Sequence, residues 1–124
     1  MNRTILIADD KPQMRRLMRR LLDSHPEWDV AEAEDGIQAV ERARHSKPDV
    51  VILDLAMPEL NGFEAARQIA HSFPNVPIFL NTLYASPEVE QEAKRFGVQQ
   101  VISKAEEQRL VPAIEEIFRT DREL

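Results

Sequence analysis

Short apolar runs alternate with longer amphipathic segments along the chain, and this alternation limits the possible folds more than any other feature. The apolar runs, each expected to form a strand, cover residues 4–8, 30–33, 50–55, 77–80 and 100–102. The amphipathic segments, each expected to form a helix, cover residues 12–24, 37–44, 63–73, 87–97 and 110–118. Such alternation predicts a parallel sheet with helices on both faces.

The run VVILDL at residues 50–55 is the most strand-like in the chain. Its first four residues are all apolar, which is typical of a strand that is buried on both faces. Because crossovers between parallel strands are right-handed, only a few doubly wound strand orders are possible. We expect a three-layer α/β fold with a five-stranded sheet in the flavodoxin-like order 2-1-3-4-5. The 124 residues fit one domain that spans residues 1–124.

Several residues predict where helices begin and end. Asp10 is a candidate cap for the helix that follows it, and Ser86 for the helix that starts at the next residue, a proline. Gly97 is expected to end that second helix. Pro112 is expected to distort the early turns of the last helix.

Composition excludes several kinds of site. The chain has no cysteine, and its three histidines have no metal-ligand spacing, so disulfides and a zinc site are not expected. The formal net charge of −6 argues against direct binding of nucleic acid by this chain. The sequence has no signal-peptide pattern and no apolar stretch long enough to cross a bilayer, which predicts a cytoplasmic protein.

Polar residues follow the predicted strands where each strand ends. Asp9 and Asp10 follow the first strand, Asp54 ends the third, Thr82 follows the fourth and Lys104 follows the fifth. In open parallel sheets, functional groups gather beyond the carboxyl ends of the strands. Strands one and three are neighbours in the expected order, so the three aspartates are predicted to converge there. The competing interpretation is that each acid only caps a helix or lies in solvent.

Three carboxylates in one crevice repel one another, and each pKa would rise without compensation. A hard divalent cation with oxygen ligands removes that cost, which predicts Mg²⁺ held by Asp9, Asp10 and Asp54. A carboxylate can also attack phosphorus and form an acyl phosphate. Asp54 is therefore the candidate acceptor, Lys104 a cation for the developing negative charge, and Thr82 a hydroxyl donor.

These residues resemble the receiver domain of two-component response regulators over nearly the whole chain. The motif consists of the Asp9–Asp10 pair, Asp54 with Met57-Pro58 and Gly62 after it, Thr82 and Lys104. Residues 9–22 and 31–36 are similar to single-domain chemotaxis regulators.

The resemblance implies a signalling domain rather than an enzyme, with a sensor histidine kinase or a histidine phosphotransfer protein as the donor to Asp54. It implies that Asp10 binds the metal directly, that Asp9 acts mainly through water, and that the Ala56 carbonyl completes the metal shell. It implies no membrane contact, an unidentified output protein or effector domain, and a phosphorylation-dependent homodimer as one option.

Three positions depart from the family pattern. Leu83 stands where a small residue is usual, Val101 where Tyr or Phe is usual, and Ala105 where a proline is common. The output surface is expected on the fourth helix, the fifth strand and the last helix. With Val101 in place of an aromatic residue, the usual ring rotation cannot operate, and Tyr84 is the candidate substitute.

The sequence leaves two alternatives to a phosphorylated receiver. The departures from the pattern favour a receiver-shaped binding module that works without phosphorylation. A haloacid-dehalogenase type of hydrolase needs a second acid two residues after its nucleophile, and Ala56 occupies that position here.

The first helix also carries four arginines that are candidates for contact with an acidic kinase surface, namely Arg15, Arg16, Arg19 and Arg20.

Overall fold

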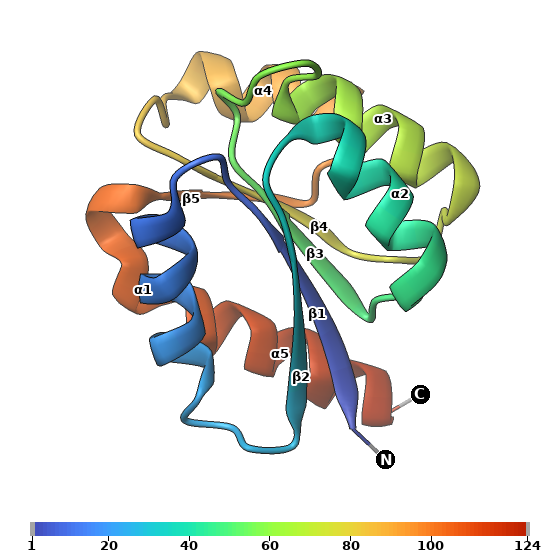
Figure 1. The fold of residues 1–124 in the computed structure, drawn as a ribbon, viewed down its shortest axis with the longest axis vertical. Coiled ribbons are helices and arrows are strands. Elements are labelled where there is room, and N and C mark those ends of the chain that lie inside the picture. Colours follow the sequence, from blue (N-terminus) through green and yellow to red (C-terminus); the bar gives the residue numbers. More distant parts are fainter. Residues whose placement is uncertain (1, 124) are drawn as a thin grey trace.

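A five-stranded parallel sheet lies between two layers of helices in the computed structural model, which describes residues 2–123 and, for residues 121–123, the backbone alone (Figure 1). The strands are β1 (Arg3–Ala8), β2 (Trp28–Ala33), β3 (Val50–Leu53), β4 (Ile78–Thr82) and β5 (Gln100–Ser103). Their order in the sheet is β2-β1-β3-β4-β5, and all four pairings are parallel. The predicted fold class and strand order are confirmed.

The helices connect the strands and cover both faces of the sheet. They are α1 (Pro12–Leu22), α2 (Gly36–Ser46), α3 (Gly62–Ser72), α4 (Pro87–Arg95), a 3₁₀ helix η1 (Lys104–Arg109) and α5 (Leu110–Glu123). In Figure 1, α1 and α5 lie on one face, and α2, α3 and α4 lie on the other.

Alternation of side chains along β1 divides the core into two halves. Ile5 and Ile7 pack with α1 and α5, whereas Leu6 and Ala8 pack with the layer of α2, α3 and α4. All residues of β3 are buried because this strand lies at the centre of the sheet with helices on both sides. The continuous apolar sequence of β3 follows from this double burial.

The structure extends four of the predicted strands by one or two residues, most clearly β2 and β4, and shortens β3. β2 begins at Trp28, two residues before the expected start. The Trp28 ring stacks on His25 with 3.8 Å between ring centroids and meets Phe118 of α5 edge-on at 5.6 Å. β3 ends at Leu53, so Asp54 lies just beyond the strand rather than within it.

Two of the four predictions about helix ends were correct. Ser86 caps α4 by accepting a hydrogen bond from the backbone N–H of Val89. Gly97 follows the end of α4 with a φ of 87°, a left-handed conformation that glycine adopts without strain.

The predictions for Asp10 and Pro112 were wrong. Lys11, not Asp10, is the N-cap residue of α1, and no side chain caps this helix. Pro112 is the third residue of α5, within the first turn, where an amide hydrogen has no partner inside the helix. The irregular backbone lies instead at Glu106 in η1, where φ is −129° and ψ is 45°.

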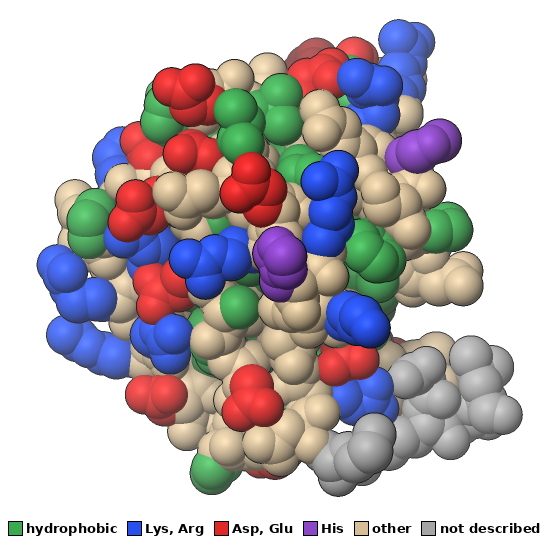
Figure 2. All heavy atoms as spheres, turned by 45° about the vertical axis from the view of Figure 1, so that its right-hand side comes forward, with side chains coloured by type: hydrophobic (Ala, Val, Ile, Leu, Met, Phe, Trp, Pro, Cys, Tyr) green, Lys and Arg blue, Asp and Glu red, His purple; other side chains and the backbone are tan. Residues whose placement is uncertain are grey.

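The surface carries mixed charge. On the side of α2 and α3, Lys and Arg side chains are interspersed with Asp and Glu (Figure 2). Within residues 2–123 there is no helix with the length and apolar character needed to span a membrane.

Candidate functional site

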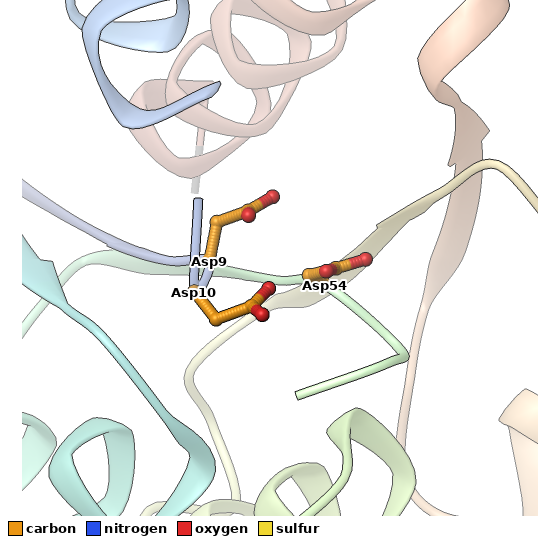
Figure 3. A group of neighbouring side chains, drawn as sticks. All are labelled: Asp9, Asp10 and Asp54. Carbon is orange, nitrogen blue, oxygen red and sulfur yellow. The ribbon is translucent and has the colours of Figure 1, made fainter. Parts of the chain in front are cut away.

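Three aspartates meet beyond the carboxyl ends of β1 and β3, as predicted (Figure 3). Each of Asp9, Asp10 and Asp54 offers a carboxylate oxygen, and these oxygens lie within 4.8 Å of one another. Asp9 and Asp54 are buried, with 0% and 6% exposed surface, whereas Asp10 is exposed. Two of the three acids are therefore buried, and the third is open to solvent.

The sheet fixes the backbone of the two buried acids. The Asp9 N–H donates to the Ala33 carbonyl at 3.1 Å, and the Asp54 N–H donates to the Ala8 carbonyl at 2.9 Å. The Asp9 carboxylate also accepts a hydrogen bond from the Lys11 N–H at 2.9 Å. Asp9 thus helps to hold the turn between β1 and α1, a contact that adjacent Asp10 was expected to make as a cap.

Lys104, the first residue of η1, points into the acid cluster. Its Nζ donates to Asp9 Oδ2 at 2.6 Å and lies 3.3 Å from Asp54 Oδ1. The side chain is only 7% exposed. Burial lowers the pKa of Lys104, but the hydrogen bond and charge of Asp9, followed by those of Asp54, outweigh it and raise the pKa above its ordinary value. Lys104 is therefore a buried ammonium group held between two carboxylates.

Burial is also the main influence on Asp54, and it raises the pKa of this carboxyl above its ordinary value. The charge of Asp9 raises the pKa further, and Lys104 opposes both effects. Additional positive charge would favour the ionised form of Asp54. Closely spaced carboxylate oxygens fit a hard cation such as Mg²⁺ in ligand type and charge. The residues present are therefore compatible with the predicted metal.

Thr82 ends β4 and is completely buried. Its hydroxyl oxygen accepts a hydrogen bond from the Tyr84 N–H at 3.0 Å, which leaves the hydroxyl proton available for another acceptor. Leu83 and Tyr84 are 70% and 62% exposed, so this loop presents two large apolar side chains to solvent. Ala56 lies in the exposed loop after Asp54.

The other two departures from the family pattern have clear structural settings. Val101 is buried in the core half that contains α2, α3 and α4. The Ala105 N–H donates to Ser103 Oγ at 3.1 Å, a bond that proline at this position would be unable to make. The polypeptide beyond Lys104 is thus turned by a side-chain hydrogen bond.

The sequence does not predict the contact between Asn81, which is buried, and Glu107, which is half-buried. Asn81 Nδ2 donates to the Ile102 carbonyl at 3.1 Å and to Glu107 Oε1 at 2.5 Å. Burial raises the pKa of Glu107, whereas the Asn81 hydrogen bond and the charge of Lys104 oppose the rise. The only signal in the sequence is an asparagine directly after the apolar residues Ile78–Leu80 of β4, and nothing in the sequence indicates its partner 26 residues away.

The four arginines of α1 are not equivalent. Arg15 and Arg19 both pair with Glu32 of β2, and Arg15 also donates to the Asp9 carbonyl at 2.7 Å. Arg16, Arg19 and Arg20 are exposed, but Arg19 is held in its ion pair with Glu32, and Arg15 is half-buried. A partner surface would therefore meet Arg16 and Arg20 more readily than the two paired arginines.

Comparison with known proteins gives a consistent result for nearly the whole chain. The family model described as the response regulator receiver domain matches residues 5–115. The chain is 30% identical over 120 residues to the chemotaxis protein CheY of Thermotoga maritima. The aligned region covers 96% of this chain and 100% of that protein. A solved two-component response regulator of the LuxR family from Aurantimonas sp. SI85-9A1 superposes with a TM-score of 0.89 at 30% identity, over 97% of this chain and 87% of that one.

Other relatives are much longer than the region of similarity. The chain is 42% identical over 77 residues to the protein-glutamate methylesterase/protein-glutamine glutaminase of Pyrococcus abyssi. That match covers 61% of this chain but only 21% of the relative. The chain thus spans about a fifth of the length of this relative.

Proposed function

The chain belongs to the response regulator receiver domain family, and from this premise we propose that Asp54 accepts a phosphoryl group in an Mg²⁺-dependent reaction. One observation carries the proposal. Three aspartates have carboxylate oxygens within 4.8 Å of one another, and Lys104 lies against two of these acids. This arrangement supplies a nucleophile, a set of oxygen ligands and a buried cation in one place.

In the proposed step, a carboxylate oxygen of Asp54 attacks phosphorus of a phosphohistidine. The new P–O bond forms as the P–N bond breaks, and the histidine nitrogen keeps the electron pair of the broken bond. Mg²⁺, when held by Asp9, Asp10, Asp54 and the Ala56 carbonyl, supplies positive charge beside the phosphoryl oxygens. Asp10 would bind directly and Asp9 mainly through water.

Lys104 and Thr82 act on the phosphoryl oxygens in this proposal. The Lys104 ammonium already lies 3.3 Å from Asp54 Oδ1, so a small movement away from Asp9 brings it to a phosphoryl oxygen on Asp54. The Thr82 hydroxyl proton is available to donate to a second oxygen. Both groups stabilise negative charge, and the chemistry needs no general base.

The signal would leave through the surface of α4, β5 and α5. The Tyr84 N–H donates a hydrogen bond to the Thr82 hydroxyl. The loop that follows Thr82 runs through Tyr84 to Ser86, the N-cap residue of α4. Movement of Thr82 toward a phosphoryl group therefore pulls on the start of α4. Val101 is buried and has no ring to turn, so the exposed Leu83 and Tyr84 are the groups of this loop that a partner would meet.

The phosphoryl donor would be a sensor histidine kinase or a histidine phosphotransfer protein. We propose that it docks on α1 close to the acid cluster, where Arg16 and Arg20 are exposed and Leu17 is 38% exposed. An apolar residue flanked by cations suits a helix that carries both apolar and acidic side chains.

Intact-mass measurement tests the proposed acceptor. Wild-type protein incubated with Mg²⁺ and acetyl phosphate should gain the mass of one phosphoryl group, and D54N should gain none. D10N should require much more Mg²⁺ for the same uptake. D49N is a matched control, because Asp49 precedes the opposite end of β3, where its carboxylate accepts from the Thr4 N–H at 2.8 Å.

Uptake by D54N equal to that of wild type would exclude Asp54 as the acceptor. A wild-type protein that takes up no phosphoryl group at any Mg²⁺ concentration would instead support a binding module that works without phosphorylation. The substitutions at Leu83, Val101 and Ala105 are what favour that second function.

A further inference from the structure

The segment that carries Lys104 is tied to the sheet by one buried side chain. Asn81 of β4 uses both hydrogens of its amide, one for the Ile102 carbonyl of β5 and one for Glu107 Oε1 of η1. Asn81 is 1% exposed. A single amide therefore joins β4, β5 and η1, directly beside the strand end where Thr82 lies.

Glu107 is the side chain of η1 beyond Lys104 that reaches into the protein. Its neighbours Ala105, Glu106, Gln108 and Arg109 are exposed. The backbone of η1 is irregular at Glu106, so regular helical hydrogen bonding does not fix this segment throughout. The bond from Asn81 to Glu107 supplies a fixed point three residues after Lys104.

The contact leaves polar atoms without partners. Within the part of the chain that the structure describes, Asn81 Oδ1 and Glu107 Oε2 are buried and accept no hydrogen bond. A buried polar atom without a partner destabilises the folded state. Burial also raises the pKa of Glu107, which reflects the same cost of placing a carboxyl group there. Because the contact between Asn81 and Glu107 carries this energetic cost, stabilisation of the fold alone does not explain it.

We propose that Glu107, held by Asn81, is a positioning residue that keeps η1 in place so that Lys104 reaches Asp54. The inference rests on the proposed phosphoryl transfer and adds a residue that acts through Lys104 without touching the phosphoryl group. Lys104 extends from the first residue of η1, so its ammonium group moves with this segment. Loss of the hydrogen bond between Asn81 and Glu107 lets η1 shift, and this shift moves the Lys104 ammonium group away from Asp54.

The test compares E107A and E107Q with wild type, with E106A as the matched control. Glu106 is exposed and pairs only with Arg109 at 3.6 Å among the contacts of the described residues. The measured quantity is the rate constant for phosphoryl uptake from acetyl phosphate at saturating Mg²⁺. A displacement of a catalytic group by about 1 Å lowers rates by up to about 100-fold, so E107A should be about 10- to 100-fold slower.

E107Q should react at nearly the wild-type rate, because its amide oxygen accepts the same bond from Asn81. E106A should also match wild type. The Mg²⁺ concentration for half-maximal rate should stay unchanged in E107A, since the three aspartates are intact. E107A removes the unpaired Glu107 Oε2 but leaves one Asn81 amide hydrogen without its acceptor, so urea unfolding should show only a small change in stability. A purely structural role would lower stability and leave the rate of the folded protein unchanged.

Equal rates in E107A and wild type would overturn the inference, as would a loss of rate in E107Q as large as that in E107A. A wild-type protein without any phosphoryl uptake would overturn the proposed function itself, and with it this role of Glu107. The two failures are distinguishable because the first leaves wild-type uptake intact.

Discussion

Gly62, the first residue of α3, lies so close to Asp54 that a single added methyl group should disturb the site. A Cβ at this position would lie 2.3 Å from the Asp54 carbonyl oxygen and 2.9 Å from the Leu55 Cα. The Gly62 N–H donates to the Leu55 carbonyl at 2.8 Å, which holds the start of α3 against the end of β3. We predict that G62A lowers both stability and the rate of phosphoryl uptake.

The structure sets the size of both effects. The 2.3 Å approach is about 1.1 Å shorter than the 3.4 Å at which ordinary van der Waals contact begins. Both clashing atoms belong to the backbone, so rotation of a side chain does not relieve the overlap. Overpacking of this kind costs about 1–3 kcal/mol, and the better helix propensity of Ala offsets at most about 1 kcal/mol of that. A shift of Asp54 by about 1 Å would slow the reaction by up to about 100-fold.

Urea unfolding and the acetyl phosphate reaction measure the two effects. The matched control is G36A, whose Cβ would lie 1.8 Å from the Leu60 carbonyl oxygen. G36A should lose at least as much stability as G62A, because its overlap is larger. Its rate per folded molecule should fall less, since the clash is with Leu60 rather than with Asp54 itself.

G62A with wild-type stability and wild-type rate would refute the argument from close approach. Equal loss of rate in G36A and G62A would show instead that any disturbance of this loop affects the reaction. Only a selective effect of G62A on the rate supports direct displacement of Asp54.

Three further predictions concern other parts of the molecule. The hydrogen bond with Glu27 outweighs burial and, reinforced by Glu115, raises the pKa of His25 above its ordinary value of 6.5. The stabilisation by charged His25 is therefore fully present below pH 6.5 and is lost as pH rises through the raised pKa. The urea midpoints of wild type and H25Q should converge over that pH range. A difference between the two midpoints that stays constant with pH would exclude this linkage. I52A removes a completely buried side chain of β3 and should cost about 2–5 kcal/mol in urea unfolding, with a loss below about 1 kcal/mol contradicting close packing there. R16E should slow phosphoryl transfer from a phosphohistidine donor and weaken the salt dependence of that rate, while phosphoryl uptake from acetyl phosphate stays unchanged. R44E, on the exposed surface of α2, should change neither the transfer rate nor its salt dependence.

Much of the fold was predictable because burial leaves a strong pattern in the sequence. β3 is covered on both faces, so its four residues are all apolar and the strand stands out. Positions at the carboxyl ends of β1 and β3 are brought together by the strand order alone, which is why the convergence of Asp9, Asp10 and Asp54 could be predicted.

The parts that were missed depend on contacts between distant side chains. Asn81 and Glu107 are separated by 26 residues, and no periodicity links them. The pairing of Arg15 and Arg19 with Glu32 likewise depends on how α1 lies over β2. The cap predicted for Asp10 failed because the choice between adjacent acids depends on side-chain direction, and it is Asp9 that accepts the Lys11 N–H.

The ion pair between Lys104 and Asp9 joins residues that are 95 positions apart, and this separation has a consequence for biosynthesis. On the ribosome, the acids that follow β1 and β3 emerge long before the lysine that lies between them. A nascent or truncated chain without β5 and η1 has Asp54 but not the ammonium group that lies beside it in the folded protein. The buried ammonium group on which the proposed reaction depends is thus the last of the four charged groups of the site to leave the ribosome.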